Sequence, residues 1–162
     1  MAIKVGDTLP TDLKLKEMGD GGPKDVTVGE VFKGKRVVVF AVPGAFTPTC
    51  HKNHLPGFVQ NAGAIKAKGI DAIAVTGVND VFVMDAWKKA SGAEGKIEFL
   101  SDGNGDFAKA LDLWIDGSGM GLGVRSKRYS MLVEDGVVKK LNVEEAPGKA
   151  DVSGAENLLK QL

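Results

Sequence analysis

The sequence predicts an α/β fold in which helices flank a mixed central sheet. Short β-branched runs alternate with helical patterns over most of the chain, which indicates strands joined by helices. Near the C-terminus, Asp135-Gly136 separates two strand-like runs, and this dipeptide is typical of a two-residue hairpin turn. An antiparallel hairpin added to strands joined by helices makes the sheet mixed.

Each element is expected from its local pattern. Apolar runs predict strands at residues 26–28, 36–42, 70–75, 97–100, 129–134 and 137–143. Helical patterns follow at residues 48–69, 80–91, 107–113 and 152–162, with a single turn at 29–34. Ser153 is expected to cap the last helix with support from Glu156, and Pro56 should kink or break the helix that begins at Pro48. Residues 19–23 and 115–123 are expected to be a turn or hairpin and a glycine-rich loop.

The bulk composition excludes several classes of protein. At 162 residues, with 43% apolar and 26% charged residues, we expect one domain over residues 1–162. The 21 basic and 21 acidic residues balance, so nothing supports binding to nucleic acid or to an anionic membrane. The N-terminus lacks the apolar core of a secretory signal, and no run is long enough to span a membrane. A cytoplasmic location is therefore predicted.

One stretch concentrates the reactive side chains. Residues 42–58, VPGAFTPTCHKNHLPGF, contain the single cysteine, Cys50, and both histidines of the chain, His51 and His54. Thr47 is expected to be the N-cap of a helix, with Pro48 at its first position. Cys50 would then lie in the first helical turn, where unpaired N–H groups favour a thiolate over a thiol. The alternative to a reactive cysteine is an inert one that packs as a small apolar side chain.

The same residues resemble a known family. The segment PGAFTPTC is similar to the active-site motif of peroxiredoxins, and the longer string through HLPGF resembles their type II subgroup. The likeness continues in GVNDVFVMDAW, SDGNGDFAKALDL and GVRSKRYSMLVEDGVVKKLNVEE, in the order of the family. The resemblance implies a thioredoxin-like fold. It also implies a thiol peroxidase that reduces hydrogen peroxide and alkyl hydroperoxides.

The resemblance assigns roles to four residues. Cys50 would attack the peroxide and become a sulfenic acid. Thr47 and Arg125 would hold the peroxide oxygens, with Arg125 lying against the sulfur, and Pro43 would shield it from water. An exposed basic cluster is the alternative for Arg125, because Lys127 and Arg128 are its neighbours.

A single cysteine decides the second half of the cycle. Some relatives place a resolving cysteine near the positions of Val75 or Val152, but this chain has none. The resemblance therefore implies an external thiol reductant, namely glutathione, glutaredoxin or thioredoxin. It also implies a homodimer, formed through loops such as those around Phe46 and Phe82; the alternative is that both phenylalanines belong to the core.

Three other functions would use some of the same residues. Cys50, His51 and His54 could bind a metal, but a closed zinc site needs further ligands, so we expect neither metal nor cofactor. A cysteine hydrolase needs a base beside the thiol, which either histidine would supply only by unusual local geometry. A non-catalytic interaction module would tolerate the loss of the thiol. His51 stands where relatives usually have serine, and a surface position is expected for it.

Overall fold

The computed structural model describes residues 2–146 and 148–162, and their main feature is a seven-stranded mixed sheet in the order β2-β1-β5-β4-β3-β8-β9. Its strands are β1 (Lys14–Gly19), β2 (Gly22–Thr27), β3 (Arg36–Val42), β4 (Ala72–Gly77), β5 (Glu98–Ser101), β8 (Tyr129–Glu134) and β9 (Val137–Val143). β3, β4 and β5 run parallel to one another, whereas the other pairs are antiparallel. The predicted α/β class with a mixed sheet is confirmed.

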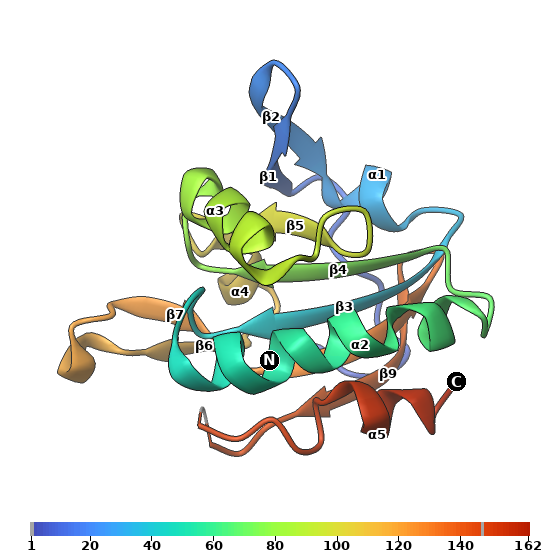
Figure 1. The fold of residues 1–162 in the computed structure, drawn as a ribbon. Coiled ribbons are helices and arrows are strands. Elements are labelled where there is room, and N and C mark those ends of the chain that lie inside the picture. The colour runs from blue at the N-terminus through green and yellow to red at the C-terminus, as the bar shows by residue number, and fades with distance from the viewer. Residues whose placement is uncertain (1, 147) are drawn as a thin grey trace.

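Helices cover both faces of this sheet (Figure 1). They are α1 (Val28–Phe32), η1 (Cys50–His54), α2 (Leu55–Lys66), α3 (Val81–Ser91), α4 (Asp106–Ala110) and α5 (Ala155–Leu159). Most buried side chains of α2, α3 and α5 belong to one apolar core, and most of those of α1 and α4 belong to a second. Among the described residues, none of the helices combines the length and apolar character that a membrane crossing requires.

The central strand β3 separates the two cores. Val38, Phe40 and Val42 lie in the core beneath α2, and Val37 and its alternating neighbours lie in the other. This alternation follows from the two-residue period of a strand. Because both faces are covered, the whole strand is apolar, which is the pattern that predicted it.

Local signals place several elements correctly. Asp80 accepts a hydrogen bond from the Val83 amide at 2.8 Å and so caps α3, as predicted. Asp135 and Gly136 both adopt positive φ, at 49° and 79°, which is the backbone of the expected tight hairpin turn. The hairpin expected at residues 19–23 joins β1 to β2.

Two expectations were wrong. The predicted glycine-rich loop is flanked by two short strands that pair as a hairpin, β6 (Trp114–Asp116) and β7 (Val124–Ser126). A short 3-10 turn, η2 (Ser118–Met120), lies between these strands. Three-residue strands leave too few alternating positions to be recognised in a sequence. Ser153 does not cap the last helix, because α5 begins after Gly154 and the Ser153 side chain bonds to Glu144 instead.

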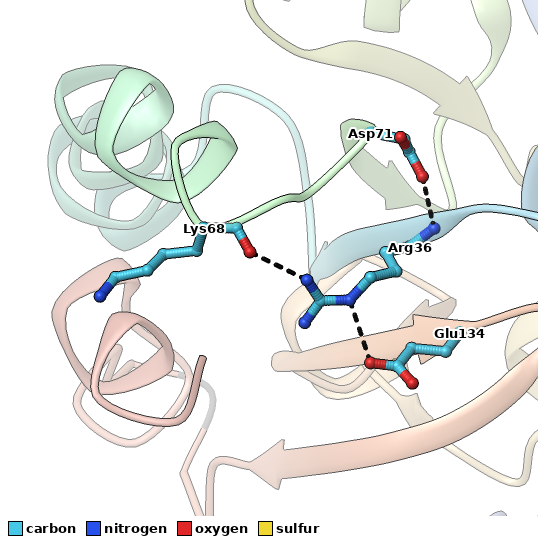
Figure 2. Close-up of polar contacts among 4 residues, drawn as sticks. All are labelled: Arg36, Lys68, Asp71 and Glu134. Carbon is cyan, nitrogen blue, oxygen red and sulfur yellow. Dashed lines mark hydrogen bonds and ion pairs between the residues drawn. The ribbon is translucent and has the colours of Figure 1, made fainter.

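Arg36 connects three segments at the end of the sheet where β3 begins (Figure 2). Its Nε donates to Glu134 at the end of β8 at 3.0 Å, and Nη1 donates to the Lys68 carbonyl after α2 at 2.9 Å. Its backbone amide donates to Asp71 at 2.8 Å. Cys50 follows the opposite end of β3, so these contacts stabilise the scaffold rather than the reactive stretch.

Candidate active site

The turn after β3 brings Cys50 to the end of the central strand. Pro43 and Gly44 are buried, and the chain becomes helical at Pro48. The Thr47 carbonyl accepts a hydrogen bond from the His51 amide at 2.8 Å, so Thr47 directly precedes the helical turn, which is the position predicted for it. Its hydroxyl donates back to the Gly44 carbonyl at 2.7 Å, which leaves the Thr47 Oγ1 lone pairs as acceptors.

The cysteine lies in a π-helical turn. η1 spans Cys50–His54, and the Leu55 amide donates to the Cys50 carbonyl, five residues back. α2 follows at once with Pro56 in its first turn. Pro56 was expected to kink or break the helix; the backbone stays helical and its hydrogen-bond register changes instead. A wider turn avoids the clash that a proline causes in a regular helix.

An arginine contacts the sulfur, but it is Arg128 rather than the expected Arg125. Arg128 Nη2 donates to Cys50 Sγ at 2.9 Å, and the side chains of both residues are almost completely buried, at 2% and 0% exposed. A buried guanidinium beside a thiol favours the thiolate, because the two opposite charges compensate each other where water is excluded. The predicted combination of a helix start and a distant arginine is present with a different arginine.

Arg125 supports the loop beneath the reactive stretch. Its Nη1 donates to the Pro43 carbonyl at 3.2 Å, and Nε donates to the Leu122 carbonyl at 2.9 Å. A Cβ atom on Gly44 would lie 2.8 Å from Arg125 Nη1, so any larger residue at this position would displace the guanidinium. Arg125 therefore connects β7 to the Pro43 turn, and neither of these two hydrogen bonds reaches the sulfur.

Strand alternation is the signal that would have identified Arg128. Within β8, Leu132 faces the core that contains Cys50, whereas Tyr129 and Met131 face the other core. Arg128 precedes β8 by one residue and is in phase with Leu132, so a two-residue period directs it to the side of Cys50. Arg125 belongs to a different, two-stranded sheet, where this argument does not apply.

His54 lies behind the arginine and is neutral. Its Nδ1 contacts Arg128 Nη1 at 3.0 Å, and its Nε2 contacts the Ser153 carbonyl at 2.9 Å. Burial is the main cause that lowers the pKa of His54 to about 3; the positive charge of Arg128 acts in the same direction, and the Ser153 bond opposes both. Neither ring nitrogen is directed at Cys50 by these contacts, which argues against His54 as the base of a cysteine hydrolase.

His51 is half-buried rather than a free surface residue. Its Nδ1 accepts a hydrogen bond from the indole Nε1 of Trp87 at 3.1 Å. The Phe46 ring lies 5.5 Å from the His51 ring, centroid to centroid. Within residues 2–146 and 148–162, no group of three or more His, Cys, Asp or Glu side chains could hold a metal ion.

Comparisons with known proteins agree with this arrangement. A family model described as Redoxin matches residues 4–159. Peroxiredoxin-2E-2, chloroplastic, of Oryza sativa subsp. japonica is 52% identical over 164 residues, covering 99% of this chain and 72% of its own length. Peroxiredoxin-2D of Arabidopsis thaliana is 41% identical over 99% of this chain and 98% of its own.

Solved structures give the same result. Reduced Prx3 of Vibrio vulnificus in complex with H₂O₂ is 50% identical, covers 98% of each chain and superposes with a TM-score of 0.92. The Plasmodium falciparum antioxidant protein, a 1-Cys peroxiredoxin, is 28% identical over 99% of this chain and all of its own, with a TM-score of 0.88. The predicted thioredoxin-like fold is confirmed. The chain belongs to the redoxin family, in which it is a one-cysteine peroxiredoxin of type II, an enzyme that reduces peroxides at the expense of thiols.

Proposed function

We propose that Cys50 is the peroxidatic residue and that its thiolate attacks one oxygen of hydrogen peroxide or an alkyl hydroperoxide. The O–O bond breaks, the sulfur is oxidised to a sulfenic acid, and water or an alcohol leaves after taking up a proton. The observation that carries this proposal is the 2.9 Å contact from Arg128 Nη2 to Cys50 Sγ. This contact supplies a fixed positive charge beside Cys50 Sγ. The negative charge of the thiolate lies on Sγ before the attack and spreads from there to the leaving oxygen of the peroxide.

Thr47 and the backbone amide of Cys50 would hold the peroxide in line. Because the Thr47 hydroxyl proton is used by the Gly44 carbonyl, Thr47 Oγ1 would accept the proton of the peroxide hydroxyl rather than donate to it. Pro43 would exclude water from the sulfur. Arg125 would act through the Pro43 carbonyl, by fixing the turn, in place of the direct role first expected for it.

Entry of the peroxide requires a small local movement. Cys50 has no exposed surface, so an oxidant reaches Sγ when neighbouring side chains open. A small peroxide needs far less displacement of these side chains than a bulky thiol reductant does. The burial of Cys50 would therefore admit the peroxide first, and a larger opening would be needed before a thiol could reduce the sulfenic acid.

The direct test is Cys50→Ser, which replaces sulfur by oxygen with little change in shape. We expect a folded protein, verified by circular dichroism and thermal unfolding, that consumes no peroxide above the rate of the buffer. Peroxide turnover by the folded serine variant would refute the proposal.

We propose an external thiol as the reductant, because the chain has no second cysteine to form an internal disulfide. The candidates are glutathione, glutaredoxin and thioredoxin. Protein oxidised by one equivalent of peroxide and then mixed with glutathione should gain one glutathione mass at Cys50. If no adduct forms and thioredoxin alone supports turnover, glutathione is not the reductant.

Assembly as a homodimer is also proposed. Phe46 and Phe82 are 46% and 64% exposed, so the alternative in which both belong to the core is wrong. A contiguous exposed apolar patch commonly marks a contact surface, and we propose that these two rings form part of such a patch in the dimer. Sedimentation at working concentration should give twice the chain mass, and Phe82→Asp should shift it toward the monomer; a monomeric parent protein would contradict the proposal. A single domain over residues 1–162 and a cytoplasmic location stay predictions.

A further inference from the structure

A closed set of hydrogen bonds lies behind the arginine that contacts the sulfur. The Ser153 carbonyl contacts His54, whose other ring nitrogen contacts Arg128. The Ser153 amide and hydroxyl both donate to Glu144 Oε2 at 2.7 Å. The Glu144 amide donates to the Arg128 carbonyl at 3.0 Å, which closes the ring of contacts.

The chemistry of the partners fixes every proton on His54. A backbone carbonyl can only accept, so the Nε2 atom facing Ser153 carries the hydrogen. A guanidinium can only donate, so the Nδ1 atom facing Arg128 is the acceptor. His54 is therefore a neutral imidazole in one defined tautomer, and this agrees with its burial at 1% exposed.

We propose that His54 is a positioning residue for the peroxidatic centre, which holds Arg128 so that its second nitrogen is directed at Cys50. The guanidinium is planar and rigid, so fixing Nη1 on His54 also sets the direction of Nη2. This inference rests on the function proposed for Cys50.

His54 links the C-terminal segment to Arg128 and, through Arg128, to the sulfur of Cys50. Glu144 follows β9, and Ser153 precedes α5, so the two ends of one connecting segment are joined by the Glu144 carboxylate. That bond orients the Ser153 carbonyl, which in turn selects the tautomer of His54. Residues 74 or more positions from His54 thus determine how the guanidinium of Arg128 is placed against Cys50.

Two substitutions separate positioning from simple structural support. His54→Asn can place its amide oxygen near the position of Nδ1, where it accepts from Arg128, but it loses the bond to Ser153. His54→Leu loses the same Ser153 bond and offers Arg128 no acceptor. The difference between them measures the contact with Arg128 alone. Gln161→Ala, which breaks the pair with Asn142 at 2.8 Å, is the control for loosening the C-terminal segment away from the site.

Thiolate absorbance in the ultraviolet should be titrated for each protein, alongside the second-order rate of oxidation by hydrogen peroxide. For His54→Leu, we expect the thiolate to form at higher pH and the rate to fall by about tenfold or more. His54→Asn and Gln161→Ala should stay within about threefold of the parent rate. If His54→Leu does not fold, His54→Gln serves instead, because its amide nitrogen takes the place of Nε2 as a donor toward Ser153 while no atom takes the place of Nδ1 as an acceptor.

Equal behaviour of the leucine and asparagine variants, in both titration and rate, would overturn the proposal. So would a leucine variant that matches the parent protein. Failure of the parent protein to react with peroxide would refute the proposed function instead, and the thiolate titration would still decide the positioning role. The two failures are therefore distinguishable.

Discussion

Replacing Arg128 by lysine separates the direction of the charge from its presence. Arg128→Lys keeps a positive side chain but loses the planar fork that contacts His54 Nδ1 and Cys50 Sγ at once, at 3.0 and 2.9 Å. A single ammonium on a flexible stem does not reproduce this paired geometry. Arg125→Lys is the matched control, because Arg125 donates to two backbone carbonyls, whereas the contact with the sulfur is made by Arg128.

The size of the effect follows from the bond that is lost. A hydrogen bond to a charged group contributes about 1.5–3 kcal/mol, and about 1.4 kcal/mol corresponds to a factor of ten in rate. If the contact between Arg128 and Cys50 acts fully in the transition state, the lysine variant should oxidise about 10- to 100-fold more slowly. Arg125→Lys removes hydrogen bonds to backbone carbonyls at a half-buried position. We expect its oxidation rate to be about three- to tenfold lower than that of the parent protein at most.

Stopped-flow oxidation under pseudo-first-order hydrogen peroxide, followed by tryptophan fluorescence, measures these rates. Thermal unfolding of each variant verifies that the fold is intact. The reasoning is refuted if Arg125→Lys slows oxidation more than Arg128→Lys does. That result would restore Arg125 as the residue that acts on the sulfur.

Three further predictions concern the surroundings of the site. The buried His54 has a pKa of about 3 when folded, against 6.5 when exposed; its contribution to stability is complete above pH 6.5 and is lost at about 1.4 kcal/mol per pH unit as the pH falls toward 3, so denaturant unfolding should depend less on pH in His54→Asn. Arg36→Met removes the ion pair with Glu134 and should lower stability by about 1–2 kcal/mol, a few degrees in Tm, without changing peroxide oxidation. Gly44→Ala places a Cβ 2.9 Å from Thr47 Cγ2 and should slow oxidation about 10- to 100-fold in a protein that remains folded.

The scaffold was predictable because its signals are local. β3, β8 and β9 occur at the predicted residues, since an apolar run flanked by turn residues needs no distant information. The same holds for the cap of α3 by Asp80. The boundaries of β4 moved by two residues, from 70–75 to Ala72–Gly77, because pairing with β3 rather than composition sets where a strand begins.

The site was predictable only in part. Cys50 and Thr47 share one helical turn, so sequence spacing places them together. The choice between Arg125 and Arg128 depends on strand phase across a sheet junction, and three basic residues within four positions gave no local preference. Ser153 was expected to cap a helix, but the buried Glu144 competes for the same hydroxyl and amide.

By itself the sequence determined the class of fold, the position of Cys50 after a strand end, and the single cysteine from which an outside thiol is proposed. These depend on residue type and on spacing within one element. The tertiary structure alone decided which guanidinium contacts Cys50 and which groups hold His54, because those contacts join segments 74 and 99 residues apart. Their geometry is set by sheet register and by the docking of the C-terminal segment, which spacing along the chain does not encode.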